Sequence, residues 1–263
     1  MRPFYYSNIC LILLCLISNV SYVDAQSGHL HDSSYFETYP DNLVTRLYYS
    51  RKFTGFHVSF KPLEDQIFKY RPNTTNNIGI GASYDWLTLN LAYGFDFLNQ
   101  NQDRGDTKYL DLQSHLYLGK INIDLFGQFY RGYYLSNQLQ PDGEIYVRPD
   151  LGVVEIGASV QYVFNHRKYS FKAAFQNTEY QKRSAGSWLL GWDMFYGAVE
   201  ADSSLVPGFI EGGFTDFDRL RFIKSGPSGG YAYTLVIANG YYLTGSAFLA
   251  VNSGVYRLKS PSD

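Results

Sequence analysis

Two neighbouring segments of the chain alternate strictly between large apolar side chains and small or polar ones. In residues 77–86 one face carries Ile78, Ile80, Ala82, Tyr84 and Trp86, and in residues 87–97 it carries Leu87, Leu89, Leu91, Tyr93, Phe95 and Phe97. Successive side chains of a strand point to opposite faces, so each segment has one apolar and one polar face. Only a tight turn separates them, and the pattern predicts a membrane-spanning β-hairpin.

Similar alternation predicts strands over residues 108–118, 121–129, 152–164, 169–175 and 188–196, and less regular ones over 220–222, 231–237 and 243–251. Residues 43–61 change phase between Phe53 and Phe56, so they form either one long strand or a hairpin. Polar loops are expected at residues 99–107 and 136–150. Asn239-Gly240 suits a type I′ hairpin turn.

The predicted connections alternate between tight turns and long loops, as in outer-membrane barrels with short periplasmic turns and long external loops. We therefore expect an all-β fold, an antiparallel transmembrane β-barrel. Such barrels have an even number of strands, so about eleven predicted strands imply about twelve in the closed barrel. The final strand is then missing from this chain, whose tail of residues 257–263 also lacks a terminal aromatic residue.

The first residues are typical of an export signal. Arg2 precedes an apolar run over residues 9–17, and Val23-Asp24-Ala25 suits cleavage before Gln26. The run is shorter than the about 20 residues that a membrane-spanning helix needs. The expected organisation is a signal peptide at 1–25, a polar leader at 26–42 and a barrel domain at 43–263.

Composition agrees with a barrel and excludes other classes. The chain contains 25 tyrosines, 19 phenylalanines and 24 glycines, which suits aromatic girdles and a crowded interior. Both cysteines, Cys10 and Cys15, lie in the signal, so the mature chain has neither a disulfide nor a thiolate metal site. The net charge of −2 predicts no nucleic-acid partner. We expect no cofactor and no metal, because His29 and His31 lie in the polar leader.

Charged and polar side chains on the predicted inner faces are the candidate site residues. They are Asp96, Asp111, His115, Asp124, Glu155, Lys172 and Asp193. Buried charges need partners, so either Lys172 and Arg46 pair with some of these acids or the interior must contain water. Three interpretations remain open: a salt-bridged filling, a polar channel or binding cavity, and an enzyme. Ser114 and His115 face opposite ways and cannot act as nucleophile and base.

Arg71-Pro72 and Arg148-Pro149 each close a loop into a strand. Two arginines at one rim would suit an anionic ligand. Proline at a strand start is equally what strand geometry requires.

Several segments together resemble a known family. They are Tyr39-Pro40-Asp41, Arg46-Leu47-Tyr48-Tyr49-Ser50, Lys69-Tyr70-Arg71-Pro72-Asn73, Leu89-Asn90-Leu91-Ala92-Tyr93-Gly94-Phe95, Lys108-Tyr109-Leu110-Asp111-Leu112-Gln113, Asp124-Leu125-Phe126-Gly127-Gln128-Phe129-Tyr130, Val147-Arg148-Pro149-Asp150, Ala201-Asp202-Ser203-Ser204-Leu205-Val206-Pro207 and Gly230-Tyr231-Ala232-Tyr233-Thr234. The chain resembles an uncharacterised family of exported Gram-negative proteins, a domain of unknown function thought to form outer-membrane barrels. The resemblance implies the fold and the location, and it implies no activity.

The expected function is a structural or passive-transport barrel in the outer membrane of a Gram-negative bacterium, with an unknown solute. Its partners would be outer-membrane lipid and the barrel-assembly machinery. The alternatives are an outer-membrane enzyme, such as a lipid hydrolase, and a soluble periplasmic β-barrel that binds a ligand.

Overall fold

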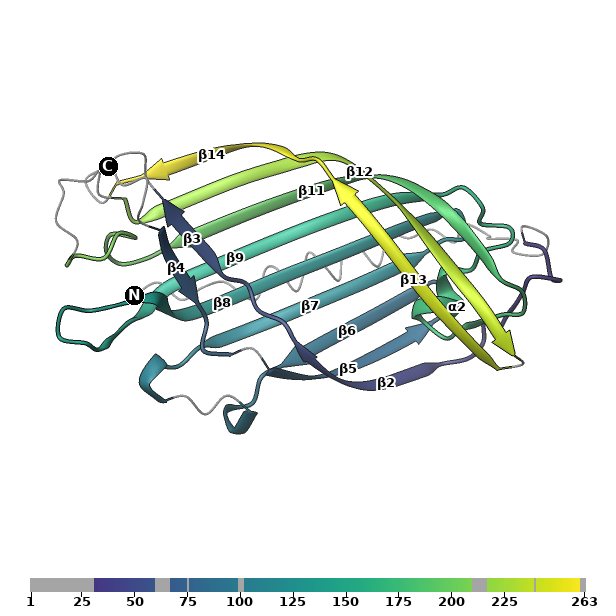
Figure 1. The fold of residues 1–263 in the computed structure, drawn as a ribbon, viewed down its shortest axis with the longest axis horizontal. Helices are drawn as coiled ribbons and strands as arrows, with labels where there is room; N and C mark the ends of the chain where they lie inside the picture. Colours follow the sequence, from purple (N-terminus) through teal and green to yellow (C-terminus); the bar gives the residue numbers. More distant parts are fainter. Residues whose placement is uncertain are drawn as a thin grey trace.

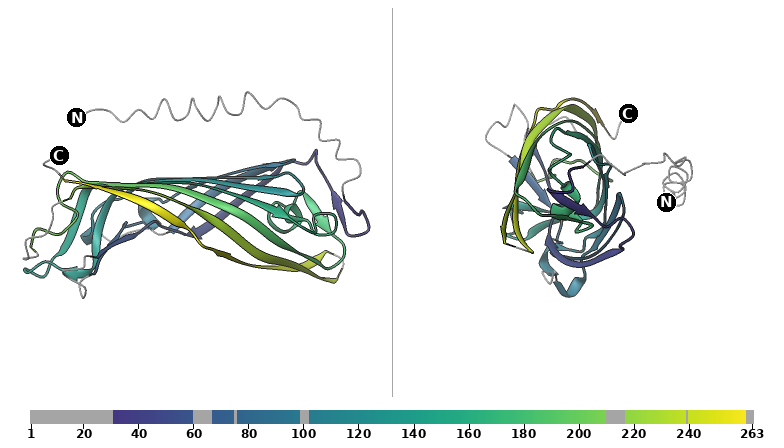
Figure 2. Two further views of the ribbon diagram at one scale, coloured as in Figure 1. Left: turned by 90° about the horizontal axis from the view of Figure 1, so that it is seen from above. Right: turned by 90° about the vertical axis from the view of Figure 1, so that its right-hand side faces the viewer.

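The fold is an all-β half-barrel made of one curled antiparallel sheet (Figures 1 and 2). The computed structural model describes residues 31–59, 67–74, 76–98, 102–209, 217–238 and 240–260. The main path of the 12-stranded sheet runs through β2 (Val44–Arg51), β5 (Asn76–Tyr84), β6 (Leu87–Tyr93), β7 (Lys108–Tyr117), β8 (Ile121–Leu139), β9 (Ile145–Val163), β11 (Ala185–Glu200), β12 (Arg219–Ala238) and β13 (Tyr241–Ala250). Within the described residues the sheet is not closed, because β2 and β13 do not pair.

Smaller elements lie at the two ends of this sheet. At one end β3 (Phe56–Ser59) pairs with β4 (Ile67–Arg71), and β14 (Ser253–Lys259) pairs with the first half of β12. This end, with the long connections 98–108 and 200–219, is called the long-loop end. At the other, the short-turn end, β1 (Phe36–Thr38) pairs with β10 (Glu179–Gln181) beside the helix α2 (Phe171–Phe175). Two short 3-10 helices, η2 (Asp96–Leu98) and η3 (Gln102–Arg104), follow β6.

The hairpin predicted from the strictest alternation is confirmed. β5 and β6 pair from Ile78 opposite Tyr93 to Tyr84 opposite Leu87. Asp85 makes the turn with a φ of 48°, a left-handed conformation that aspartate tolerates better than most residues. β6 ends at Tyr93, earlier than predicted, and Phe97 lies in η2.

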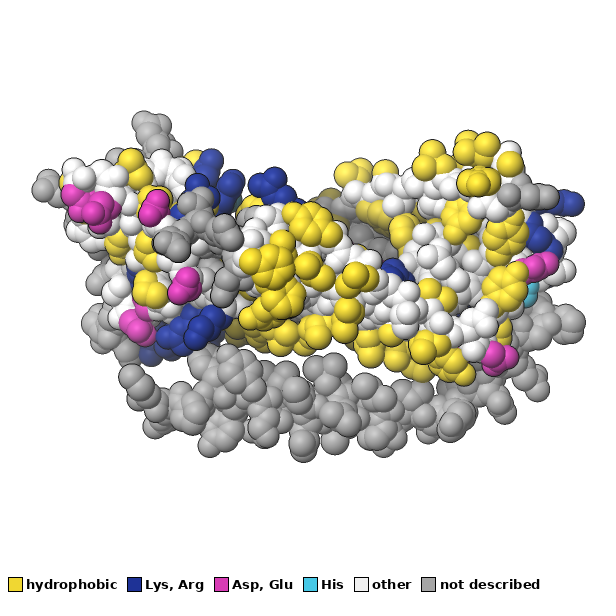
Figure 3. Space-filling model, turned by 90° about the horizontal axis from the view of Figure 1, so that it is seen from below, with side chains coloured by type: hydrophobic (Ala, Val, Ile, Leu, Met, Phe, Trp, Pro, Cys, Tyr) yellow, Lys and Arg dark blue, Asp and Glu magenta, His cyan; other side chains and the backbone are white. Residues whose placement is uncertain are grey.

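Alternation along the strands separates an apolar convex face from a polar concave face. Leu47 is 77% exposed on the convex side, whereas Ser83 on the concave side is fully buried. Other exposed side chains of the convex face are Tyr49, Ile80, Leu89, Leu91, Leu125, Ile156, Val160, Leu190, Met194, Ile223 and Leu243. Buried polar side chains of the concave face are Asn77, Thr88, Asp111, Asn122, Gln128, Ser187, Asp193, Ser228 and Thr234. Figure 3 shows hydrophobic side chains spread over the middle of the surface and charged ones mostly toward its two ends.

The apolar part of the interior is divided between the two ends. At the long-loop end a cluster contains Phe68 and Tyr70 of β4, Tyr133 and Leu135 of β8, and Leu205. At the short-turn end a second cluster joins Val163, Tyr169, Leu189 and Ala232, with Phe171 packed against it. The polar side chains of the concave face lie between these two clusters.

The predicted loop at residues 136–150 is wrong, because β8 and β9 continue as a long hairpin to Leu139 and from Ile145. The extension is held from outside the hairpin. β4 pairs with its edge at Leu135 and Tyr134, and Asn137 donates a hydrogen bond to the carbonyl of Ile67. Residues 136–150 have the composition of a loop. They extend β8 and β9 because β4, which is distant in the sequence, pairs with β8.

The strand predicted over residues 169–175 is also wrong, since residues 171–175 form the helix α2. Ser170 caps the helix, and its side chain accepts a hydrogen bond from the amide of Ala173 at 2.8 Å. Phe171 packs edge-on against Tyr117 of β7, with ring centroids 5.4 Å apart. The alternating aromatic residues pack in a helical turn against the inner side of the sheet and do not extend it.

The strands near the C-terminus are merged and regrouped relative to the prediction. Residues 220–222 and 231–237 belong to one strand of 20 residues, β12, which also contains Pro227. Proline is tolerated there because β13 and β14 meet opposite it, and the carbonyl of Pro227 accepts from the amide of Val251. Residues 43–59, the described part of the segment 43–61, form neither a single strand nor a hairpin, because β2 ends at Arg51 and β3 pairs with β4. Asn239 and the signal peptide lie outside the described residues.

A substitution at Gly157 tests how closely side chains pack on the concave face. A Cβ atom at this position would lie 2.3 Å from Cε1 of Phe126 and 2.7 Å from Cδ1 of Phe195. Gly157→Ala should therefore lower the free energy of unfolding by about 1–3 kcal/mol, as overpacking does. The measurement is the urea midpoint. Gly245→Ala in β13, where a Cβ meets nothing within 4 Å, is the matched control and should not lower the midpoint, because alanine there only reduces the freedom of the unfolded chain. Equal midpoints for both variants would contradict this packing.

Candidate functional site

Most of the predicted site residues lie together on the concave face. Asp111, His115, Asp124, Glu155 and Asp193 project from β7, β8, β9 and β11 between the two apolar clusters. Lys172 lies elsewhere, on α2. Asp96 begins η2, and its side chain lies outside the described part of the chain.

Asp111 is the most deeply buried acid of the group, with 2% of its side chain exposed. Its Oδ2 lies 3.1 Å from Nζ of Lys52 and accepts a hydrogen bond from Nε2 of Gln128 at 3.2 Å. Thr54 donates in turn to Oε1 of Gln128 at 2.5 Å. Lys52 and Thr54 follow β2, so the segment between β2 and β3 closes over this carboxylate and neutralises it.

A transverse row of polar side chains crosses the middle of the concave face. Asp124 stands opposite His115 on one side and Ser159 on the other, and Ser159 stands opposite Asp193. His115 Nδ1 lies 2.6 Å from Asp124 Oδ1. Ser159 and Ser228 donate to Asp193 Oδ1 at 2.7 and 3.0 Å. Cross-strand register therefore aligns these groups so that each acid finds a partner on a neighbouring strand.

Glu155 is paired with a lysine that also contacts aromatic rings. Nζ of Lys224 lies 3.5 Å from Oε1 of Glu155 and 4.8 Å from the ring centroid of Phe195. The same ammonium lies 5.5 Å from the ring centroid of Phe222. An ammonium over aromatic faces is stabilised by the ring quadrupoles, which helps to hold a charge on a partly buried surface.

The expected pairing of Lys172 and Arg46 with these acids is wrong. Lys172 Nζ lies 3.6 Å from Asp85 in the β5–β6 turn and 4.0 Å from Glu179 of β10. Arg46 donates to Oγ of Ser83 and to the carbonyl of Phe175, both at 3.0 Å. Both cations therefore find their partners at the short-turn end, where residues 171–175 fold as the helix α2.

Residues 164–184 form a plug segment across the short-turn end (Figure 1). Gln181 is fully buried and its amide donates to the carbonyls of Tyr35, Lys168 and Arg183. Glu179 accepts a hydrogen bond from Ser170. Burial raises the pKa of the Glu179 carboxyl above its usual range, and the hydrogen bond from Ser170 and the Lys172 ammonium oppose this shift.

The two rim arginines have structural partners. Arg148 is buried and forms a two-pronged pair with Asp150, with nitrogen–oxygen distances of 2.9 and 2.8 Å. It also donates to the carbonyls of Ser203 and Ser204 at 3.2 and 2.6 Å. Arg71 lies over the ring of Phe53. Arg148 is thus saturated by protein acceptors and leaves no donor directed at a ligand.

Sequence reasoning missed several partners of the concave face. Gln128 and Ser159 point to the same concave face as the predicted acids. The alternation of side chains along β8 and β9 already places them there, so the sequence could have identified them. Lys52 and Thr54 lie between strands, where no periodicity marks them. Lys224 points to the concave face from β12. In that strand glycine and proline residues interrupt the alternation of apolar and polar side chains.

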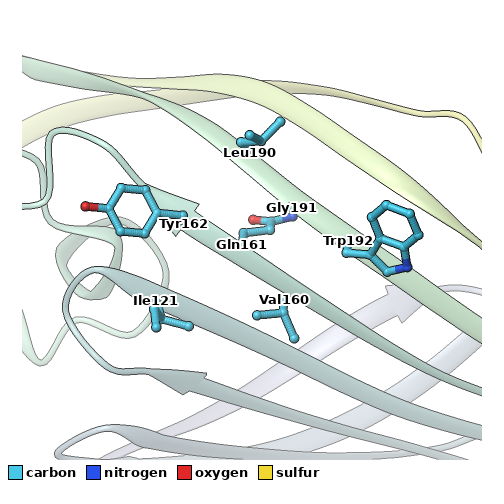
Figure 4. A pocket seen from close by; sticks show the side chains of 7 residues that line it. All are labelled: Ile121, Val160, Gln161, Tyr162, Leu190, Gly191 and Trp192. Atoms are coloured by element: carbon cyan, nitrogen blue, oxygen red, sulfur yellow. The ribbon is translucent and has the colours of Figure 1, made fainter.

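A shallow recess of about 340 Å³ lies on the convex face (Figure 4). It is lined by Ile121, Val160, Gln161, Tyr162, Leu190, Gly191 and Trp192 of β8, β9 and β11. Its wall is apolar and open to the outside. Such a surface fits a hydrocarbon chain and offers almost no polar group for a hydrophilic ligand.

A family model matches residues 31–262, nearly all of the described chain. Its description is a domain of unknown function, DUF4421. The chain belongs to this family. No curated protein and no solved structure matches it. Among the residues that the structure describes, no helix is long and apolar enough to cross a membrane.

Two segments that lie far apart in the sequence meet in the structure. Arg148 and Asp150 come from the segment Val147-Arg148-Pro149-Asp150, and Ser203 and Ser204 from the segment 201–207. Asp150 also accepts from the amide of Asp202 at 3.0 Å. Their joint role is to fasten the connection after β11 against β9.

A substitution at Asp111 tests how much the hydrogen-bonded polar groups of the concave face contribute to stability. Asp111→Ala leaves the Gln128 amide and the Lys52 ammonium without their acceptor, and we expect a loss of about 2 kcal/mol in the free energy of unfolding. The check is urea unfolding followed by tyrosine fluorescence. Asp124→Ala is the comparison, because 35% of the Asp124 side chain is exposed and its loss should cost less than about 1 kcal/mol. A larger loss at Asp124 than at Asp111 would be incompatible with this difference in burial.

Glu179 makes the stability of the plug segment depend on pH. Its raised pKa means that the folded protein binds a proton more readily than the unfolded chain. This favours folding fully below about 4.3, the pKa of an unfolded glutamate, and the contribution is lost as pH rises through the folded pKa. Glu179→Gln should remove this dependence, so the urea midpoint of wild type minus that of the variant should fall as pH rises through this window. A constant difference would contradict it.

Proposed function

We propose that the chain forms a transmembrane β-barrel of the outer membrane with a filled interior and a structural role. The observation that carries the proposal is the inverted arrangement of side chains. Large apolar residues cover the convex face and are exposed, while polar residues on the concave face are buried, and several of them, such as Asp111 and Asp193, are hydrogen-bonded. In water this arrangement exposes apolar surface far larger than soluble monomers tolerate, whereas in a bilayer the same surface contacts lipid.

Aromatic side chains near both ends of the strands support membrane insertion. At the short-turn end Trp188 and Tyr231 pack together with centroids 5.0 Å apart, and Tyr84 is exposed on β5. At the long-loop end Tyr93 packs against Phe95 at 5.1 Å. Outer-membrane barrels carry such girdles where the apolar band meets the lipid headgroups. The apolar recess of the convex face would lie against acyl chains.

The filled interior favours a structural role over passive transport. Apolar clusters occupy the concave side at both ends, and the acids between them are paired with Lys52, His115, Lys224 and serine hydroxyls. A passive pore instead needs a continuous water path lined by groups that water can reach. Export by the signal peptide and insertion by the barrel-assembly machinery complete the proposal.

Membrane fractionation tests the outer-membrane location, and conductance measurements test whether the interior is filled. The full chain, expressed with its N-terminal segment in a Gram-negative host, should sediment with the outer membrane and resist urea extraction. Purified into planar bilayers, it should give no steady conductance above that of protein-free membranes. A stable monomer in detergent-free buffer would overturn the membrane location and favour a soluble periplasmic barrel. Steady conductance would instead favour passive transport.

A pair of leucines with nearly equal exposure tests what the convex face touches. Leu190 is 58% exposed in β11, and Leu139 is 59% exposed at the tip of the β8–β9 hairpin. Leu190→Arg should cost about 2–4 kcal/mol and reduce the amount of protein in the outer membrane, because arginine would face lipid. Leu139→Arg should be neutral in the same assay, since the hairpin projects beyond the band. In a water-exposed protein both changes would be harmless, and that result would contradict the proposal.

A further inference from the structure

The convex face becomes basic where its strands approach the long-loop end. One row of cross-strand partners runs unbroken through β7, β8, β9, β11, β12 and β14 at that end. Its members, in this order, are Lys108, Arg131, Gly152, Glu200, Arg219 and Lys259. The next row toward the middle of the strands, two residues away, places Arg221 opposite Arg257.

The change from apolar to basic is abrupt. The following row consists of Leu112, Gly127, Ile156, Tyr196, Ile223 and Val255, and it carries no charge. Near the short-turn end the row of Ile121, Tyr162, Leu190 and Gly229 carries none either. The apolar surface of the convex face therefore ends in a line of cations at the long-loop end.

Two pairs of like charge face each other across β12 and β14. Arg219 is the register partner of Lys259, and Arg221 is that of Arg257. Directly opposite side chains of antiparallel strands have Cβ atoms about 4.5–5.5 Å apart, and like charges in these positions destabilise the pairing. These four cations and Glu200 are called the basic cluster. An anion bound between the pairs would relieve the repulsion.

Glu200 neutralises only part of the basic cluster. Its Oε1 accepts a hydrogen bond from Nη2 of Arg221 at 2.8 Å and lies 3.3 Å from Nε of Arg219. All three side chains stay at least 37% exposed. Arg257 and Lys259 form no ion pair with any residue that the structure describes. Four cations against one carboxylate leave a net charge of +3.

A third pair of like charge lies further along the same row. Lys108 and Arg131 are register partners, both are exposed, and within the described chain neither forms an ion pair. Arg131 is separated from Arg219 by three strand spacings, which is about 14 Å. Gly152 leaves space in the interval, since a Cβ there would have no neighbour closer than 3.8 Å. A ligand with two anionic groups at this separation would reach both basic regions.

We infer that this basic row binds the phosphate groups of a diphosphorylated glycolipid, the lipid A of the external leaflet. The inference rests on the proposed function. Guanidinium groups match phosphate in charge and in geometry. The long loops of outer-membrane barrels are external, so the row would lie beside the external headgroups. A disaccharide with a phosphate at each end suits two basic regions better than a phospholipid with one phosphate.

The neighbouring apolar row favours a lipid over a free phosphate ion. Ile223, Val255 and Tyr196 are 51%, 74% and 38% exposed directly beside the basic cluster. A lipid whose phosphate binds the cations would place its acyl chains on these side chains. Binding would then combine ionic contacts with burial of apolar surface, as amphiphilic ligands at membrane surfaces do.

The test removes charges that have no acid partner in the described structure. The cluster variant carries Arg257→Gln and Lys259→Gln, which keep the contacts of Glu200. The matched control carries Arg51→Gln and Lys120→Gln, since both residues are exposed and Arg51 faces Asn76 instead of a cation. The full chain is purified from the membrane in neutral detergent and mixed with lipid A, phosphatidylglycerol or inorganic phosphate. Phosphorus that co-elutes with the protein in gel filtration measures binding.

We expect the wild type and the control to retain lipid A equally and the cluster variant to retain several-fold less. Phosphatidylglycerol should be retained several-fold less than lipid A by the wild type, and inorganic phosphate at the same concentration should not displace lipid A. Without lipid, the cluster variant should resist heat at least as well as the wild type, because repulsion between like charges is reduced.

Each contrary result overturns the inference in a different way. Equal retention of lipid A by the cluster variant would show that these cations do not bind it. Equal retention of phosphatidylglycerol would indicate a general attraction to acidic lipid. Displacement by inorganic phosphate would indicate an ion site. Lower heat resistance of the lipid-free cluster variant would indicate a structural role for the cations.

The failure of this inference can be told apart from failure of the proposed function. Outer-membrane recovery of a protein whose variants retain lipid A equally would refute the inference alone. A chain that is a stable monomer without detergent would refute the membrane location, and the lipid site would fall with it.

Discussion

The structure depends on one constraint: successive side chains of a strand point to opposite faces, and the sheet curls so that the polar face lies inside. Seen end-on in Figure 2, the strands curve around the concave side. Exposed Leu47 and Leu190 on the outside and buried Ser83 and Asp111 on the inside follow from that curl. Apolar burial alone does not explain the fold, because the largest apolar surface faces outward. Backbone hydrogen bonds between neighbouring strands hold the sheet.

The concave face satisfies its own charges. Asp111 is closed over by Lys52 and Gln128, Glu155 pairs with Lys224, and Asp193 accepts from two serines. A polar layer of this kind tolerates burial because few of its groups are left without a partner, and it stiffens the strands that supply it. The apolar clusters above and below it, around Tyr70 and around Tyr169, separate this layer from both ends.

The plug segment links this filling to the open side of the sheet. Its helix is capped by Ser170 and packed on Tyr117, and it binds both edge strands through Arg46 and Tyr242. The same segment therefore packs in the short-turn end and is hydrogen-bonded to both β2 and β13. A connection between β9 and β11 that first appears to be an ordinary loop and strand thus organises the least complete part of the sheet.

What the sequence by itself determined is the all-β class, the β5–β6 hairpin and the face on which most side chains lie. Alternation with period two is a local property and needs no knowledge of partners. The sequence also placed Asp111, His115, Asp124, Glu155 and Asp193 on the correct face.

Only the tertiary structure decided the partners and the irregular elements. Lys52 reaches Asp111 across 59 positions, and Lys224 reaches Glu155 across 69, so no local pattern could pair them. The β8–β9 extension exists because β4 and the carbonyls of Ser203 and Ser204 hold it. Residues 171–175 became a helix because their aromatic rings find partners inside the curl, which only the assembled sheet provides.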